Sequence, residues 1–224
     1  MAKLLPCVEI DPPGAPSGAV LWLHGLGASG HDFEEIVPLL ELPTVRFVFP
    51  HAPSRPVTIN AGMVMPAWYD VPSLGAGGGG QDEPGIRASA GEIERLLERE
   101  EKRVPSTRIV IAGFSQGGAM ALHVGTRYPR PLLGIMVLSA YEVLPEARKE
   151  ESPANRATPL LCCHGRFDPL VPVARGRQAY EVHARGRTAE WHDSPMAHEV
   201  SVDEIGVIRR WLHARFGPAP AARA

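Results

Sequence analysis

Short hydrophobic runs recur along the chain and alternate with longer stretches in which apolar residues have helical spacing. Continuous runs of this kind are typical of strands that are buried on both faces of a parallel sheet. The pattern therefore predicts an α/β fold with a mainly parallel central sheet and helices on both faces. The runs cover residues 18–25, 45–50, 108–114, 132–140 and 159–165, with a weaker one at 188–193.

Three of the segments between or after these runs are predicted helices. In residues 86–103 the apolar positions recur so that one helix face would be buried. The other two follow a serine that has an acidic residue three positions later, which is a typical capping arrangement. The first is residues 30–41, which follow Ser29 and contain Asp32. The second is the segment from about Asp203, which follows Ser201 and contains Glu204.

The length of 224 residues fits a single domain, which we predict over residues 1–216, with a flexible tail at 217–224. Only 27 residues, 141–167, separate the run at 132–140 from Asp168, an acidic residue just past the run at 159–165, so no inserted domain that would cap a site at the strand ends is expected. The long connection at 51–85 is therefore the expected cover of a functional site. Its glycine run at 77–80 lacks the lysine, strand and helix of a phosphate-binding loop, and is predicted to be a hinge or lid.

Composition and charge narrow the class of protein. With 44% hydrophobic and 21% charged residues the chain resembles an ordinary globular protein, and its net charge of -2 gives no general attraction for nucleic acid. No apolar run is long enough to span a membrane, and the N-terminal run is interrupted by Pro6. Three cysteines without the spacing of disulfides or zinc ligands favour a reducing compartment. We predict a cytoplasmic protein with no metal or cofactor.

The stretch RIVIAGFSQGGAMALHVG, residues 108–125, places Ser115 between a predicted strand and a predicted helix. A serine nucleophile on such a sharp turn needs small neighbours, so that strand and helix can approach each other closely. Gly113 and Gly117 meet this need. We predict that Ser115 is a nucleophile; a serine that merely occupies a tight turn is the alternative.

A serine nucleophile needs a general base that a carboxylate orients, and in this architecture the acid and then the base follow the serine along the chain. Asp168 comes just after the run at 159–165, and His198 lies on a loop before the last helix. They are the predicted acid and base, with Asp70 and Asp193 as fallback acids. Other histidines fall on predicted strands or helices, where packing or surface roles are commoner: His164, His192, His123, His183 and His213.

The negative charge that develops during acyl transfer needs backbone N–H donors in fixed positions. The residue after the nucleophile, Gln116, supplies one such donor. The glycine-containing turn LHGLGASGHDF, after the run at 18–25, offers the second, for which Leu26 is the candidate. An ordinary turn from strand to helix is the alternative reading of this second segment.

Four segments, LHGLG, GFSQGGAMAL, HGRFDPLVP and MAHEV, together resemble the carboxylesterase and acyl-protein thioesterase family, also called phospholipase/carboxylesterase, of α/β-hydrolases. The resemblance runs from about residue 5 to residue 216. It includes RPVTINAGMVMPAWYD and DEPGI, which resemble the bacterial esterase branch. It implies the same triad, Ser115, Asp168 and His198, and the same donors, Leu26 and Gln116. It also implies that Trp68 helps to wall the acyl site.

One departure from the family is visible, since many relatives carry an acidic residue where this chain has Ala28 and Ser29. That change removes any role of the acid but leaves the backbone donor in place. The predicted function is hydrolysis of a carboxylic ester or thioester through an acyl-enzyme on Ser115. Simple esters, lysophospholipids and acylated proteins are all compatible substrates, and Met63, Val64, Met65 and Trp68 offer an apolar groove for a small to medium acyl chain.

Two other functions remain open from the sequence. One is a binding module with a hydrolase fold that has lost catalysis, and the other is a serine acyltransferase that uses an alcohol instead of water. Because relatives often form dimers, a homodimer is also expected.

Overall fold

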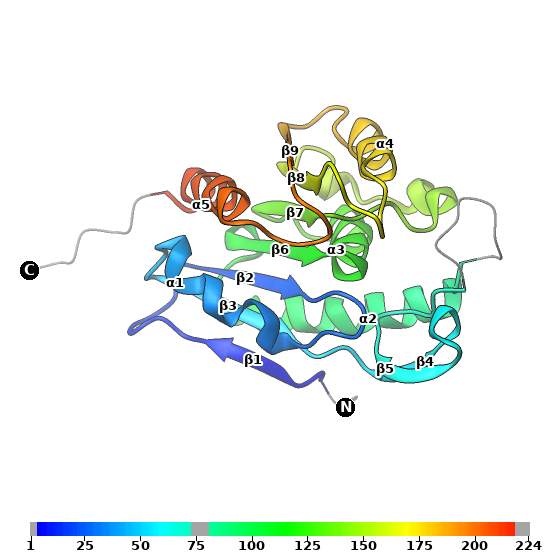
Figure 1. Ribbon diagram of the computed structural model, residues 1–224. Coiled ribbons are helices and arrows are strands. Elements are labelled where there is room, and N and C mark those ends of the chain that lie inside the picture. Colours follow the sequence, from blue (N-terminus) through cyan, green and yellow to red (C-terminus); the bar gives the residue numbers. More distant parts are fainter. Residues whose placement is uncertain (1–3, 73–80, 218–224) are drawn as a thin grey trace, which may run out of the picture.

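The computed structural model describes residues 4–72 and 81–217, and it confirms the predicted α/β-hydrolase fold. Within these residues a seven-stranded sheet has the order β1-β3-β2-β6-β7-β8-β9, and only β1 runs antiparallel to its neighbour (Figure 1). The strands are β1 (Cys7–Ile10), β2 (Gly18–Leu23), β3 (Val45–Pro50), β6 (Ile109–Phe114), β7 (Gly134–Leu138), β8 (Leu160–Gly165) and β9 (Ala189–Ser194). The predicted hinge at 77–80 and the tail residues 218–224 lie outside the described residues.

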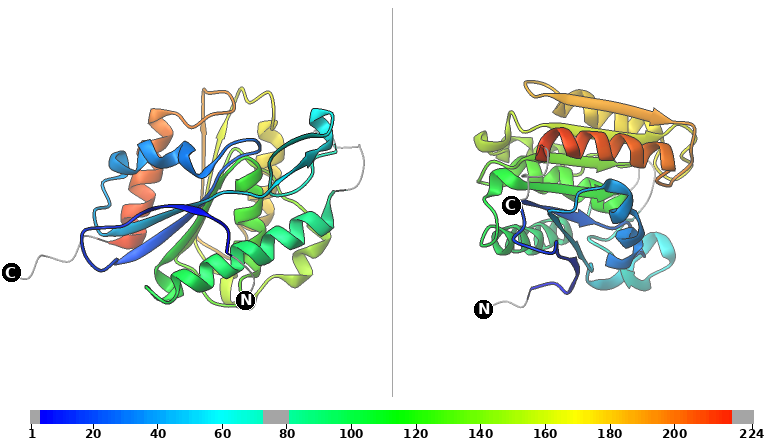
Figure 2. Two further views of the ribbon diagram at one scale, coloured as in Figure 1. Left: turned by 90° about the horizontal axis from the view of Figure 1, so that it is seen from below. Right: turned by 90° about the vertical axis from the view of Figure 1, so that its left-hand side faces the viewer.

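Helices cover both faces of this sheet, as the left view of Figure 2 shows. Strand β2 illustrates why, because its side chains alternate between two hydrophobic clusters: Leu21 packs on one face and Trp22 on the other. The first face carries α2 (Glu83–Glu100), α3 (Gln116–Arg127) and α4 (Val173–His183), and the second carries α1 (Val37–Leu40) and α5 (Val202–Phe216).

Residues 30–41 differ from the predicted helix. Ser29 and Asp32 form the expected capping box, but the segment continues as the 3₁₀ helix η1 (Gly30–Ile36) and ends in the short helix α1. Glu41 then adopts a left-handed conformation, with φ of 54°, and terminates the helix.

Four further elements had no clear signal in the sequence. Strand β1 is a short edge strand, and β4 (Ser54–Val57) pairs with β5 (Met63–Pro66) in a largely exposed hairpin. Helix α4 buries only Gly176, Ala179 and His183. Its sequence therefore shows no hydrophobic stripe from which a helix could be predicted.

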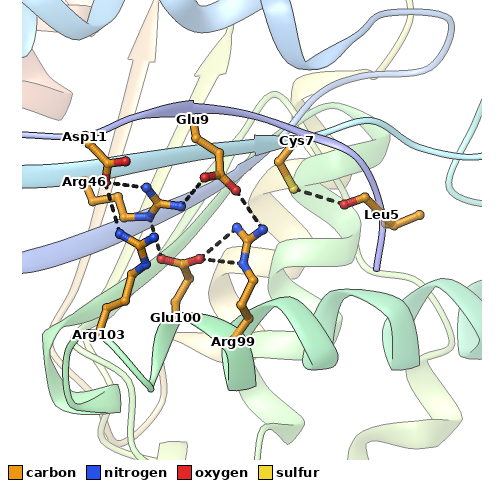
Figure 3. A network of polar contacts seen from close by, with 8 residues as sticks. All are labelled: Leu5, Cys7, Glu9, Asp11, Arg46, Arg99, Glu100 and Arg103. Carbon is orange, nitrogen blue, oxygen red and sulfur yellow. Dashed lines mark hydrogen bonds and ion pairs between the residues drawn. The ribbon is translucent and has the colours of Figure 1, made fainter. Parts of the chain in front are cut away.

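A cluster of charged side chains, which we call the Arg46 cluster, joins β1 to the rest of the molecule (Figure 3). Arg46 is 1% exposed and donates to Glu100 on α2 over 2.8 Å, and it also pairs with Glu9 on β1. The full cluster is Glu9, Asp11, Arg46, Arg99, Glu100 and Arg103.

The charges of this cluster neutralise one another. Arg99 pairs with Glu9 at 2.7 Å and with Glu100 at 2.8 Å. Burial alone would raise the pKa of Glu9, but the hydrogen bonds and charges of Arg46 and Arg99 outweigh that effect and lower it. The cluster therefore links the short edge strand β1 to β3 and α2.

The parallel strands β2, β6, β8 and β9 all end at the same edge of the sheet. In open α/β sheets, ligands bind outside the carboxyl ends of the strands. The loops after these four strands carry Leu26, Ser115, Asp168 and His198, and so bring the predicted site together.

Candidate active site

Ser115 lies on a sharp turn between β6 and α3, with φ of 54° and ψ of -120°. A non-glycine residue seldom adopts this conformation, which sharp catalytic turns impose. A Cβ atom on Gly113 would lie 2.2 Å from the carbonyl oxygen of Gly117, and one on Gly117 would lie 2.4 Å from that of Leu23. Both positions therefore require glycine, as the sequence predicted.

The side chains of Ser115, His198 and Asp168 form a hydrogen-bonded chain. Nε2 of His198 lies 2.8 Å from Oγ of Ser115, and Nδ1 lies 2.6 Å from Oδ2 of Asp168. A carboxylate can only accept, so Nδ1 carries the proton and donates it to Asp168. Nε2 is then free to accept the proton of the serine hydroxyl. This arrangement is the one that a general base requires.

The loop that carries Asp168 is itself held in place. Oδ1 of Asp168 accepts hydrogen bonds from the backbone N–H groups of Leu170 and Val171, at 2.9 and 2.8 Å. His164 donates through Nε2 to the carbonyl oxygen of Val171 over 2.8 Å. Burial lowers the pKa of His164, so this ring stays neutral beside the acid. His164, interpreted from the sequence as a packing residue, thus supports the acid loop, and its position four residues before Asp168 is the signal that could have revealed it.

The other candidates lie elsewhere. Asp70 accepts hydrogen bonds from Thr58, and Asp193 lies near Arg166 and Trp191. Of the remaining histidines, His183 pairs with Glu142. The hydroxyl group of Ser115 hydrogen-bonds to His198 and to none of these side chains.

The backbone N–H groups of Leu26 and Gln116 donate to no acceptor within residues 4–72 and 81–217. Both residues line the pocket beside Ser115. Gln116 is also the first residue of α3, where the helix dipole favours negative charge. Two free donors therefore border the space in front of the serine.

The pocket has a volume of about 600 Å³ and a predominantly apolar wall. Of the residues predicted to form this wall, Met65 does so, whereas Met63 is 64% exposed and does not line the pocket. Trp68 is fully buried behind the pocket, where its indole N–H donates to the carbonyl oxygen of His24. The apolar lining residues are Leu26, Ala28, Phe33, Ile36, Ile59, Met65, Val71, Phe114, Leu170, Val171 and Val200.

Sequence reasoning missed the contribution of the segment after Ser29. Phe33 and Ile36 reach the pocket from η1, and Asp32 and Glu199 add carboxylates to its lining. The available signal was position, because η1 follows directly after the turn that carries Leu26.

Neither a metal site nor a membrane span emerges from the described residues. No three His, Cys, Asp or Glu side chains among them are grouped so that they could hold a metal ion. No helix in residues 4–72 and 81–217 is both long and apolar enough to cross a membrane.

Sequence comparison identifies relatives along almost the whole chain. The family described as Phospholipase/Carboxylesterase matches residues 6–215. Acyl-protein thioesterase 1 of Yarrowia lipolytica is 35% identical over 217 residues, which cover 92% of this chain and 96% of that protein. Acyl-protein thioesterase 1 of Mycosarcoma maydis is 34% identical, over 88% of this chain and 90% of its own.

Solved structures with the same fold also match almost the whole chain. Arabidopsis thaliana SOBER1 superposes with a TM-score of 0.83 at 31% identity, covering 88% of this chain and 98% of that one. Zea mays acyl-protein thioesterase 2 has a TM-score of 0.82 at 29% identity, covering 95% and 99%. Because the family match covers residues 6–215 and relatives more than 30% identical cover most of the chain, the chain belongs to the phospholipase/carboxylesterase family.

Proposed function

We propose that this hydrolase, which acts on esters or thioesters, works through an acyl-enzyme on Ser115. The observation that carries the proposal is the hydrogen-bonded chain from Asp168 through His198 to Ser115, which ends in an apolar pocket between two free backbone donors. Acyl transfer requires these parts, a nucleophile, an oriented base and an oxyanion site.

In the first half of the reaction, Oγ of Ser115 attacks the carbonyl carbon while its proton moves to Nε2 of His198. The carbonyl oxygen becomes an oxyanion that accepts hydrogen bonds from the N–H groups of Leu26 and Gln116. The intermediate then collapses, the bond to the leaving oxygen or sulfur breaks, and His198 returns the proton to the leaving group.

In the second half, water attacks the acyl-serine and His198 takes its proton. Collapse of the second intermediate releases the carboxylic acid and restores the hydroxyl of Ser115. The acyl chain lies against the apolar wall that Met65 and Leu170 help to form. The predicted cytoplasmic location and homodimer remain predictions from the sequence.

The test is a panel of esters and thioesters of increasing acyl length, with wild type beside Ser115→Ala. We expect the wild type to hydrolyse members of the panel, and the variant to lose a factor of about 10⁴ to 10⁶ in kcat. A fluorophosphonate should label Ser115 in the wild type, as detected by mass spectrometry. If Ser115→Ala keeps wild-type turnover, Ser115 is not the nucleophile. Ester products formed with added alcohols would favour the acyltransferase alternative.

A further inference from the structure

The two proposed oxyanion donors belong to separate segments, Leu26 to the turn after β2 and Gln116 to the start of α3. We propose that the segment from Pro66 to Tyr69 braces these two segments against each other, with the side chains of Gln116 and Trp68 as positioning residues. This inference rests on the proposed function, because it concerns how the oxyanion site is held. It also gives Trp68 a role other than walling the acyl site.

The side chain of Gln116 makes the first half of the brace. It is 2% exposed, and its Oε1 accepts a hydrogen bond from the backbone N–H of Trp68 over 2.8 Å. Its Nε2 donates to the carbonyl oxygen of Tyr69, also over 2.8 Å. Each end of the amide thus meets the partner that it requires, which fixes the orientation of the side chain. The residue that offers a backbone donor to the pocket is tied through its side chain to residues 68–69.

The same short segment holds the turn that carries Leu26. The indole N–H of Trp68 donates to the carbonyl oxygen of His24 over 2.8 Å, and the N–H of Gly27 donates to the carbonyl oxygen of Pro66 over 2.8 Å. Residues on both sides of Leu26 are therefore bonded to residues 66–68. Leu26 itself contributes no such bond, so its N–H stays available to a ligand.

His24 completes the fixation of this turn. Its Nε2 accepts a hydrogen bond from the backbone N–H of Ala52 over 3.0 Å, so that Nδ1 carries the proton and donates to the carbonyl oxygen of Gly25 over 2.7 Å. Burial lowers the pKa of His24, which keeps the ring in this neutral form. Hydrogen bonds within the protein thus hold the turn at His24, Gly25 and Gly27.

The physical reason for such a brace is the precision that the reaction needs. Removing a single oxyanion donor typically costs about 10² to 10³ in rate, and a displacement of about 1 Å can cost about 10². Two donors on independent loops would vary in separation, whereas four hydrogen bonds to one segment fix both. Because an oxyanion exists only in the tetrahedral intermediates, loosening the brace should lower kcat and leave KM nearly unchanged.

The first variant is Gln116→Met, which removes both side-chain bonds, keeps the backbone N–H and nearly keeps the volume. We expect kcat/KM to fall by about 10-fold to 100-fold with KM changed by less than about threefold. Trp68→Phe removes the indole donor alone and should cost about tenfold. Rates are referred to active sites counted by exhaustive fluorophosphonate titration, so that loss of folded protein does not contribute.

A second measurement reports on the oxyanion site without turnover. An alkyl trifluoromethyl ketone forms a tetrahedral oxyanion adduct with a reactive serine, and ¹⁹F NMR measures its affinity. We expect this affinity to fall by the same factor as kcat/KM in each variant. The affinity of the unreactive alcohol with the same alkyl chain should stay at the wild-type value.

The chain supplies matched controls. Asn155 is another fully buried amide, which bonds to Leu132 and Tyr128 away from the pocket, and Asn155→Leu should lower Tm without lowering kcat/KM per active site. The indole N–H of Trp211 has no partner within the described residues, so Trp211→Phe loses no hydrogen bond and should behave as wild type in turnover.

The outcomes are distinct. Parallel losses in kcat/KM and ketone affinity support the brace. Wild-type values for both in Gln116→Met, or a raised KM with kcat unchanged, overturn it. If Gln116→Met does not fold, Trp68→Phe decides by the same criteria. If the wild type itself neither hydrolyses esters nor binds the ketone, the proposed function fails, and the brace fails with it.

Discussion

Two networks of polar side chains, each with a buried carboxylate, lie in different parts of this molecule: the trio of Asp168, His198 and Ser115, and the Arg46 cluster. Both contain carboxylates that are shielded from water. In the Arg46 cluster each carboxylate faces a guanidinium, and no member lines the pocket at Ser115. The trio instead runs from a carboxylate to a hydroxyl group at the pocket.

The difference shows what turns a buried polar network into a reactive one. Burial and short hydrogen bonds are common to both, and structural ion pairs perturb their groups as strongly as catalytic ones do. Only the trio ends in an atom that can form a bond to a ligand. We therefore expect substitutions in the trio to affect rate and substitutions in the Arg46 cluster to affect stability.

Apart from the loss of the nucleophile in Ser115→Ala, the largest effect expected is that of Asp168→Asn on kcat. The amide can still accept the bonds from Leu170 and Val171, but it no longer selects the tautomer of His198 that leaves Nε2 free. We expect kcat to fall by about 10⁴ with Tm close to that of wild type, as measured by ester hydrolysis and thermal unfolding. Asp193→Asn, at the exposed fallback acid, should retain full activity. A fall smaller than tenfold in Asp168→Asn would remove Asp168 from the mechanism.

The Arg46 cluster should show the reverse behaviour. Glu100 is fully buried between Arg46 and Arg99, so Glu100→Gln leaves the cluster with three guanidinium groups and only two carboxylates. We expect the free energy of unfolding in urea to fall by about 4 kcal/mol, with kcat per active site unchanged. The control is Glu98→Gln, because Glu98 is 56% exposed and should change stability by less than about 0.5 kcal/mol. A loss of turnover without a loss of stability would contradict the contrast between the two networks.

The sequence predicted the trio because its members follow strand ends in the order of this architecture, and because Gly113 and Gly117 meet a steric need that local sequence reveals. The positioning role proposed for Trp68 could not be predicted from local sequence in this way. Its partners Gln116 and His24 are distant along the chain, and an aromatic residue beside a functional loop fits a pocket wall as well as a buried brace.

The fold shows the same division. Strands buried on both faces, such as β6, can be recognised in the sequence as hydrophobic runs. Helix α4 and strand β1 bury too little apolar surface to show a periodic pattern, and β1 is held by its pairing with β3 and by the charged contacts of the Arg46 cluster. Elements that depend on such long-range contacts cannot be predicted from the local pattern of hydrophobic and polar residues.

The smallest effect tests the opposite case, a buried glutamate without a cation. Glu204 is 1% exposed, and neither of its carboxylate oxygens has a partner within residues 4–72 and 81–217. Burial raises its pKa from 4.5 to about 8. Between these two values the folded protein retains a proton that the unfolded chain has released, so the free energy of unfolding falls as pH rises from about 4.5 to about 8.

Glu204→Gln should therefore remove a decline of roughly 3 kcal/mol between pH 5 and pH 8, as urea unfolding at several pH values would measure. Glu98→Gln should keep the wild-type slope. The same change from Glu to Gln therefore has opposite consequences at the two sites. At Glu100 it destabilises the protein. At Glu204 its effect on the free energy of unfolding is more favourable at pH 8 than at pH 5. Equal pH slopes in wild type and Glu204→Gln would mean that Glu204 is ionised in the folded protein, because a carboxylate charged in both states takes up no proton on folding.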